Sequence, residues 1–294
     1  MTLLAGFDEH DVEVGEVTIH AAVAGSGPPL LLLHGYPQTH AMWHAVAPRL
    51  AEDFTVVAAD LRGYGGSSRP PGGDDHAGYA KRAMAADQVA LMERLGHETF
   101  AVAGHDRGAR VTHRMCRDHP ERVTRAAVLD IVPTTFVFDN TDLALAKAYY
   151  HWFFLSQPPE LPERLIAGDP EYYLRRCLGS WSRRPGAFAE EVFAEYLRYF
   201  ADPATITATC EDYRAAISID LEHDRADDAR IRCALLVLWG GTGVVGTLYD
   251  VLAVWREAAS DPALVTGRPM DCGHVLPEEE PEETYRALRE FFTA

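Results

Sequence analysis

The sequence is poor in positive charge. Its 294 residues include 27 Lys and Arg against 44 Asp and Glu, which gives a formal net charge of -17 at pH 7. Nucleic acids are recognised through basic surfaces that neutralise phosphates, and anionic lipid surfaces attract polybasic segments. We therefore expect neither nucleic acid nor a membrane surface as a partner of this chain.

Paired cysteines and long apolar runs are also missing. The five cysteines are an odd number and show neither C-x-x-C nor zinc-ligand spacing: Cys116, Cys177, Cys210, Cys233 and Cys272. This pattern predicts reduced thiols in a cytoplasmic protein. No metal site is expected, because no cluster of His, Cys and Asp shows ligand spacing in the sequence. No stretch of about 18 uncharged apolar residues occurs. The acidic segment 1–20 also lacks the basic and apolar regions of a signal peptide, so no membrane segment or export signal is expected.

What the sequence does contain is an alternation of apolar runs and helical patterns. Strands are predicted at 17–24, 30–33, 54–59, 99–103, 123–129 and 234–239. Helices are predicted at 79–95, 109–118, 248–259 and 281–292. Continuous apolar strands separated by helices are typical of a mostly parallel, doubly wound α/β sheet.

The alternation stops in an aromatic-rich segment between about 137 and 228, where no comparably strong strand pattern occurs. We interpret this segment as a helical insertion. The prediction is a core domain formed by 1–137 and 229–294, with a helical cap domain at 138–228.

No G-x-S-x-G motif occurs, which argues against a serine esterase, lipase or peptidase. Instead, a predicted strand runs directly into Gly104-His105-Asp106-Arg107-Gly108. This has the form of a nucleophile elbow with Asp106 in the nucleophile position. A carboxylate is ionised at neutral pH and can displace a leaving group from saturated carbon, forming an ester that water then cleaves. Taken alone, the motif is also compatible with an ordinary Asp helix cap.

Three motifs together resemble the α/β-hydrolase fold of haloalkane dehalogenases and epoxide hydrolases. They are His34-Gly35-Tyr36-Pro37-Gln38, Asp60-Leu61-Arg62-Gly63-Tyr64-Gly65-Gly66-Ser67 and the elbow itself. The variant His105-Asp106-Arg107-Gly108-Ala109-Arg110 resembles more narrowly the fluoroacetate (haloacetate) dehalogenases, over nearly the whole chain. Relatives acting on neutral substrates typically carry Trp at position 107. The resemblance implies hydrolysis of a short 2-haloacid without a cofactor, often by a homodimer.

Two arginines follow the nucleophile at a spacing of three, so both can lie on the side of the helix that Asp106 faces. Guanidinium groups bind carboxylates in fork geometry, which predicts that Arg107 and Arg110 hold the carboxylate of an anionic substrate. The resemblance implies the same role. A surface salt bridge is the alternative for Arg110.

The base is expected at His274, because this fold keeps a histidine after its last strand. Asp130 ends a predicted core strand, where open α/β sheets place functional groups, and would orient that histidine. In the same fold, the backbone N–H groups of Tyr36 and Arg107 would form the oxyanion hole.

The resemblance also implies a halide site formed by His151, Trp152 and Tyr213. Fluoride needs several hydrogen-bond donors in a dry pocket, and these three side chains can supply them. The alternative is that the aromatic residues simply pack the cap against the sheet.

Two other functions stay open. An epoxide hydrolase would use the same nucleophile and base, with cap tyrosines such as Tyr149, Tyr150 and Tyr213 protonating the epoxide oxygen. A non-catalytic ligand receptor could share the fold. The two arginines at the elbow favour the haloacetate dehalogenase.

Overall fold

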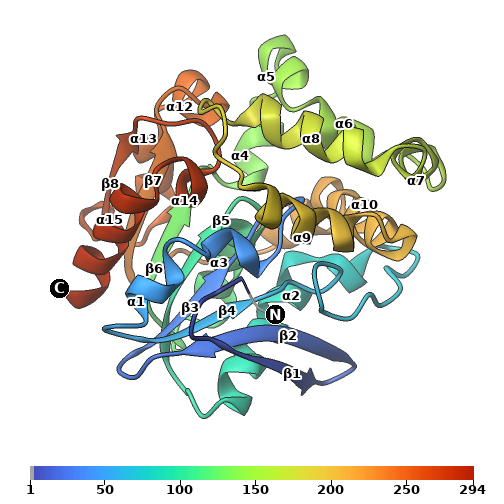
Figure 1. Ribbon diagram of the computed structural model, residues 1–294. Coiled ribbons are helices and arrows are strands. Elements are labelled where there is room, and N and C mark those ends of the chain that lie inside the picture. The colour runs from blue at the N-terminus through green and yellow to red at the C-terminus, as the bar shows by residue number, and fades with distance from the viewer. Residues whose placement is uncertain (1–2) are drawn as a thin grey trace.

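The computed structural model describes residues 3–294, which form one eight-stranded sheet with helices around it (Figure 1). The strands are β1 (Asp8–Val14), β2 (Val17–Ala24), β3 (Pro29–Leu33), β4 (Thr55–Ala59), β5 (Phe100–His105), β6 (Val123–Leu129), β7 (Ala234–Gly240) and β8 (Val265–Met270). Their order is β1-β2-β4-β3-β5-β6-β7-β8. Only the β1–β2 and β2–β4 pairs are antiparallel. The mostly parallel α/β sheet predicted from the sequence is confirmed.

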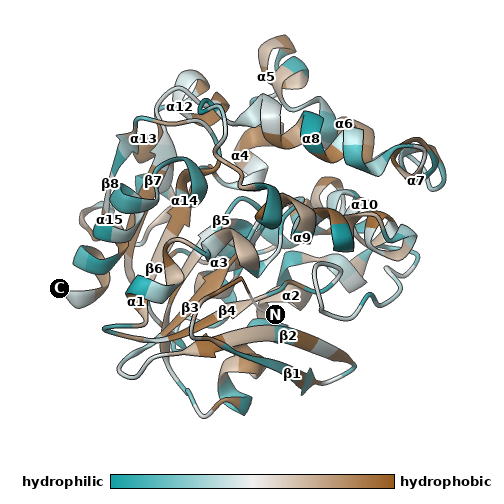
Figure 2. Cartoon of the chain, in the orientation of Figure 1, coloured by the Kyte–Doolittle hydropathy of each residue, from teal (hydrophilic) through white to brown (hydrophobic). Residues whose placement is uncertain are grey.

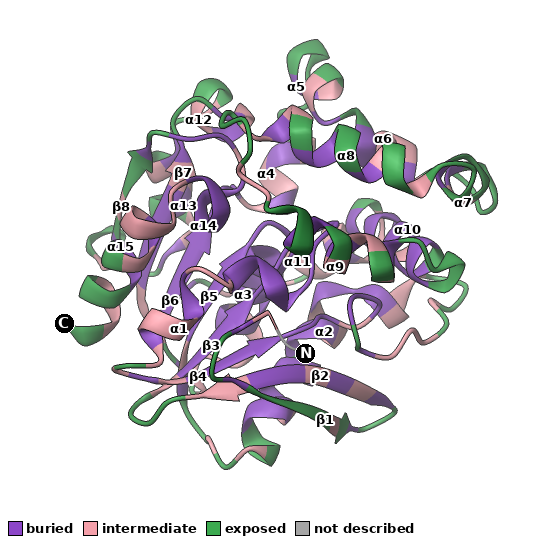
Figure 3. Cartoon of the chain, in the orientation of Figure 1, coloured by how far each residue is buried: buried purple, intermediate pink, exposed green. Residues whose placement is uncertain are grey.

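The central strands β3 and β4 are almost entirely apolar because helices cover the sheet. The side chains of 30–33 in β3 and 56–59 in β4 are fully buried. Figure 2 shows these strands as the hydrophobic centre of the molecule, and Figure 3 shows the same strands as buried. The core helices and 3-10 turns are η1 (His40–Trp43), α1 (Ala47–Leu50), η2 (Ala77–Tyr79), α2 (Lys81–Arg94), α3 (Arg107–Asp118), α12 (Val244–Leu248), α13 (Val251–Ala258), η3 (Pro262–Leu264), α14 (Leu276–Glu279) and α15 (Pro281–Thr293).

Two edge strands were not predicted. β1 is mostly exposed and polar, and β8 contains Gly267 and Pro269, so neither shows the apolar run that marks a central strand. The predicted helix at 248–259 was also wrong in its start. α12 ends at Leu248, and α13 begins only after Asp250, whose side chain accepts a hydrogen bond from the Ala253 N–H as an N-cap.

Between β6 and β7 the chain is helical. This part contains α4 (Thr134–Asp139), α5 (Leu143–Ala148), α6 (Tyr150–Leu155), α7 (Leu161–Ala167), α8 (Pro170–Trp181), α9 (Glu190–Phe200), α10 (Pro203–Ile217) and α11 (Ile219–Arg225). Figure 1 shows α5, α6, α8 and α9 lying across one end of the sheet. The boundary at 137/138 stays a prediction, and α4 crosses it. Every helix within residues 3–294 is too short or too polar to cross a membrane.

The parallel register brings the strand ends level at one edge of the sheet. Leu33 at the end of β3 pairs with Gly104, and His105 pairs with Leu129. The residues that follow β5 and β6, Asp106 and Asp130, therefore emerge side by side at the carboxyl edge, where α/β sheets place functional groups.

Candidate active site

The turn between β5 and α3 holds Asp106 in an unusual backbone conformation, with φ 44° and ψ -110°. A side chain at Gly104 would collide with the carbonyl group of Gly108, and a side chain at Gly108 would collide with the carbonyl group of His34. Both flanking glycines are therefore required by close backbone approach, as expected for an elbow.

The carboxylate of Asp106 is buried and ionised. Burial alone would raise its pKa, but the surrounding positive charge, with His274 contributing most, lowers the pKa below its usual value. The Tyr36 backbone N–H donates to Oδ2 of Asp106 at 3.1 Å. The Arg107 N–H lies in the first turn of α3, where backbone donors have no acceptor within the helix. Of the two predicted oxyanion donors, the Tyr36 N–H therefore contacts the carboxylate, and the Arg107 N–H belongs to the next residue along the chain.

His274 and Asp130 meet although they are 144 residues apart. Nδ1 of His274 lies 2.6 Å from Oδ2 of Asp130, whose Oδ1 accepts the Gly240 N–H at 2.8 Å. Burial disfavours a charged imidazole, but the hydrogen bond and charge of Asp130 outweigh it and raise the pKa of His274. The backbone N–H of His274 also donates to the carbonyl of Trp181 in α8, which ties this loop to the helical segment.

A cavity of about 240 Å³ joins these groups to the helices above them. Asp106, Asp130 and His274 line it from the sheet side. Its aromatic lining consists of Tyr149, Tyr150, His151, Trp152 and Trp181. A carboxylate, an acid-paired histidine and aromatic polar groups therefore line one small cavity.

The three residues predicted as a halide site lie together. The ring of Tyr213 is centred 5.8 Å from that of His151 and 6.3 Å from that of Trp152. His151 and Trp152 reach the cavity wall, whereas Tyr213 does not. Burial lowers the pKa of His151 to about 3 and raises that of Tyr213. Both side chains are therefore neutral near pH 7, and each carries a hydrogen-bond donor.

Neither arginine of the elbow is among the residues that line the cavity, so their role toward a substrate carboxylate stays a prediction. Nε of Arg107 donates to Oδ2 of Asp212 at 2.8 Å, and Nη2 donates to the Asp212 carbonyl at 2.8 Å. Its guanidinium carbon lies 4.4 Å above the ring of Tyr213, and that of Arg110 lies 4.5 Å above the ring of Trp152. In the described part of the chain, Nη1 of Arg107 and Nε of Arg110 are buried without a hydrogen-bond partner.

Asp212 is a buried residue that the sequence reasoning missed. It accepts hydrogen bonds from Arg107, from the Lys81 ammonium and from the Tyr64 hydroxyl, the last at 2.7 Å. Burial would raise its pKa, but the two cations hold the pKa far below its usual value. One feature of the sequence could have indicated Asp212: it directly precedes Tyr213, which was already predicted to be a functional residue.

The cavity has three cations that were also missed: Lys147 in α5, Arg176 in α8 and Arg183 just after α8. All three are exposed. No carboxylate oxygen within residues 3–294 lies within 4.0 Å of their charged nitrogens. The acids in the same wall are Asp106 and Asp130 alone. The helical side of the cavity is therefore electropositive in a chain of net charge -17.

Comparison with known proteins places this architecture among the α/β hydrolases. Residues 28–281 match the family model of the α/β hydrolase fold. A fluoroacetate dehalogenase from Burkholderia sp is 46% identical over 99% of this chain and 95% of the relative. A soluble epoxide hydrolase from Corynebacterium sp. (strain C12) is 35% identical over 96% of both chains. A solved structure assigned to the α/β hydrolases, from Nostoc sp PCC 7120, is 58% identical with a TM-score of 0.96 over 98% of both chains.

The fold, the elbow and these relatives agree with the resemblance found in the sequence. This chain is a hydrolase that belongs to the α/β-hydrolase family and, within it, to the haloacetate dehalogenase group.

Proposed function

We propose that this hydrolase removes halide from short 2-haloacids such as fluoroacetate or chloroacetate and releases glycolate. One observation carries the proposal: Asp106, the Asp130–His274 pair and the donors of α6 all line one cavity of about 240 Å³. A cavity of this size suits a substrate of a few heavy atoms.

In the first step an Oδ atom of Asp106 attacks the α-carbon from the side opposite the halogen. A C–O bond forms while the carbon–halogen bond breaks, and the halide leaves with the bonding electron pair. Because the carboxylate is already ionised, this step needs no base. The product is an ester between Asp106 and the carboxymethyl group.

In the second step the neutral imidazole of His274 takes a proton from water, and the hydroxide attacks the carboxyl carbon of Asp106. The Tyr36 and Arg107 backbone N–H groups stabilise the resulting oxyanion. Collapse breaks the bond between that carbon and the glycolate oxygen, which restores the Asp106 carboxylate. The glycolate oxygen takes one proton and one further proton is released to solvent.

Positive charge around the cavity supports an anionic substrate. Lys147, Arg176 and Arg183 have no carboxylate partner among the described residues and offset the repulsion from the acidic chain at the cavity. Arg107 and Arg110 add charge close to Asp106. With two of its nitrogens engaged by Asp212, Arg107 would bind a substrate carboxylate through Nη1 rather than through its full fork.

The donors beside the nucleophile suit a departing halide. His151 and Trp152 line the cavity and Tyr213 lies against both. Neutral N–H and O–H donors stabilise a leaving anion without trapping it as a permanent ion pair. The halide role of these three residues is part of this proposal.

Epoxide hydrolysis is the second candidate, favoured by the phenols of Tyr149 and Tyr150 in the cavity wall. Burial raises the pKa of both, so each stays protonated and could donate to an epoxide oxygen. An epoxide gains nothing from the three cations, whereas a haloacid does. We therefore rank the dehalogenase first.

The proposal is tested by measuring halide release from fluoro-, chloro- and bromoacetate beside diol formation from a small epoxide. We expect halide release from haloacetates, and none from Asp106→Asn. Epoxide turnover without halide release would reverse the ranking of the two candidates. Halide release at the native rate by Asp106→Asn would remove the nucleophile from the mechanism.

The same proposal includes a cytoplasmic location, cofactor-independent turnover and a homodimer. Sedimentation at assay concentration checks the dimer.

A further inference from the structure

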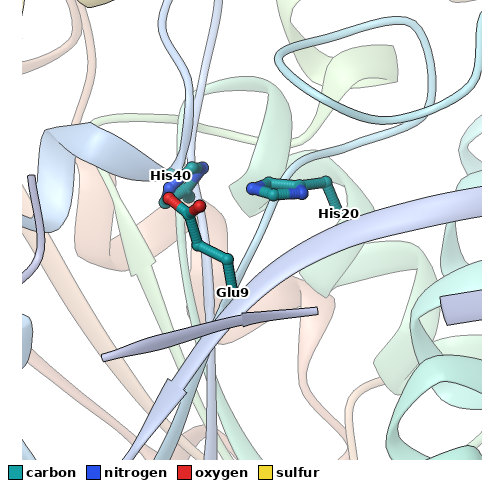
Figure 4. A group of neighbouring side chains, drawn as sticks. All are labelled: Glu9, His20 and His40. Atoms are coloured by element: carbon teal, nitrogen blue, oxygen red, sulfur yellow. The ribbon is translucent and has the colours of Figure 1, made fainter. Parts of the chain in front are cut away.

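A second cluster of chemically active side chains lies outside the cavity of Asp106, where β1 and β2 pair and η1 packs beside them. Figure 4 shows Glu9 from β1, His20 from β2 and His40 from η1 pointing toward a common point. None of the three lines the cavity of Asp106. The cluster is therefore not explained by the dehalogenase chemistry.

The strand register explains why these side chains converge. Asp11 pairs directly with His20, and Glu9 pairs with Ala22 two residues along each strand. Since side chains alternate across a strand, Glu9, Asp11 and His20 share one face of the hairpin. His40 joins them from the segment that follows β3. The two imidazole rings are centred 5.3 Å apart.

Each histidine has one ring nitrogen held by a carboxylate. Nδ1 of His20 lies 2.8 Å from Oδ1 of Asp11, and Nδ1 of His40 lies 3.0 Å from Oδ1 of Asp60. Asp60 is fixed in turn by the backbone N–H groups of His40 at 2.7 Å and Gly66 at 2.8 Å. Proton donation from each Nδ1 leaves the lone pair on Nε2, which is the tautomer that metal-binding histidines adopt.

The ligand atoms of Glu9, His20 and His40 all lie within 4.8 Å of one another. Bonds of about 2.0–2.2 Å to a shared ion would need only a modest contraction of this set. Glu9 is exposed and forms no ion pair among the described residues, so its side chain can make that adjustment. Asp11 and Asp60 add negative charge behind the two rings.

We propose that Glu9, His20 and His40 bind one divalent transition-metal ion of the zinc class, with water in the open position. Two imidazoles and one carboxylate favour Zn²⁺, Co²⁺ or Ni²⁺ over Mg²⁺ and Ca²⁺, which prefer oxygen ligands alone. The ion would cross-link the β1–β2 hairpin to the segment that follows the Tyr36 turn. Binding of the ion would stabilise the fold. This metal site does not depend on the proposed dehalogenase activity.

The test uses the full chain without a histidine tag, stripped with a chelator and titrated with Zn²⁺ by calorimetry and with Co²⁺ by visible absorption. We expect one ion per chain, a Tm that rises with Zn²⁺ concentration, and no response to Mg²⁺. Glu9→Gln and His20→Asn should abolish the Co²⁺ spectrum, and Asp11→Asn should weaken Zn²⁺ binding by about 10–100-fold.

Glu13→Gln is the matched control, because Glu13 is also exposed and shares the face of β1 that carries Glu9 and Asp11. It should bind Zn²⁺ as the native chain does. Equal affinity in Glu9→Gln, His20→Asn and Glu13→Gln would overturn the proposal, as would the absence of Zn²⁺ binding to the native chain. The readouts are binding and Tm, so a failed dehalogenase assay leaves this result unaffected.

Discussion

Replacing His274 by Asn should separate the two halves of the proposed reaction. Attack by Asp106 needs no base, because positive charge around the carboxylate lowers its pKa and keeps it ionised. Hydrolysis of the ester needs the imidazole that Asp130 orients at 2.6 Å. Loss of a general base costs about 10²- to 10⁴-fold in rate. We therefore expect one halide ion per active site in a fast burst, followed by turnover reduced by at least about 10²-fold.

Rapid-quench halide measurement gives the burst, and intact-protein mass spectrometry gives the adduct. The mass of the variant should increase by one carboxymethyl group, and peptide mapping should place that group on Asp106. Because Asp130 would be left buried with the Gly240 N–H as its remaining partner, Tm is measured beside activity. His10→Asn, at an exposed position of β1, is the control and should turn over normally.

Near-native steady turnover by His274→Asn would refute the assignment of the base. A stable adduct on any residue other than Asp106 would refute the assignment of the nucleophile. A folded variant that shows neither burst nor adduct with haloacetates would contradict the proposed order of steps.

Three further predictions concern charge. Arg176→Gln should lower kcat/KM for haloacetate about twofold at about 0.01 M salt and less at about 0.15 M, since a charge about 10 Å away in water contributes about 0.4 kcal/mol. The control is Arg175→Gln, because Arg175 is the adjacent exposed arginine and is already paired with glutamates. This variant should have little effect in the same assay. His274 must be neutral to act, so kcat should rise with pH as the imidazole loses its proton at its raised pKa. Asp130→Asn should slow turnover and should also move this rise in kcat to lower pH, because the carboxylate that raises the pKa of His274 is lost. Burial raises the pKa of Glu278 to about 8, so the folded state binds more protons than the unfolded state between pH 4.5 and 8. The native chain therefore loses stability as pH rises through that window. The Tm of Glu278→Gln should rise relative to that of the native chain from about pH 6 to about pH 9, and a Tm difference that does not change with pH would contradict this.

Much of the fold could be read from the sequence because its signals are local. The apolar runs of the central strands are a direct consequence of burial on both faces, and all six predicted strands are present. The edge strands were missed because exposure removes that constraint: β1 reads DEHDVEV, and β8 tolerates Gly267 and Pro269. The elbow could also be predicted from the sequence, because neighbouring backbone lies so close to Gly104 and Gly108 that neither position can carry a side chain.

The sequence did not reveal which side chains far apart in the chain would contact one another. Arg107 was predicted to hold a substrate carboxylate, but the sequence did not indicate that Asp212, 105 residues away, would accept hydrogen bonds from two of its nitrogens. The cations of the cavity wall come from α5 and α8, and nothing in their spacing marks them as neighbours of Asp106. Glu9, His20 and His40 have no ligand spacing in the sequence and meet only through strand pairing.

By itself, then, the sequence determined where strands and the nucleophile turn form, since burial and backbone sterics act on consecutive residues. The tertiary structure alone decided which charges neutralise one another and which remain open to a ligand. That outcome depends on how segments pack through space, and the order of residues along the chain does not record it.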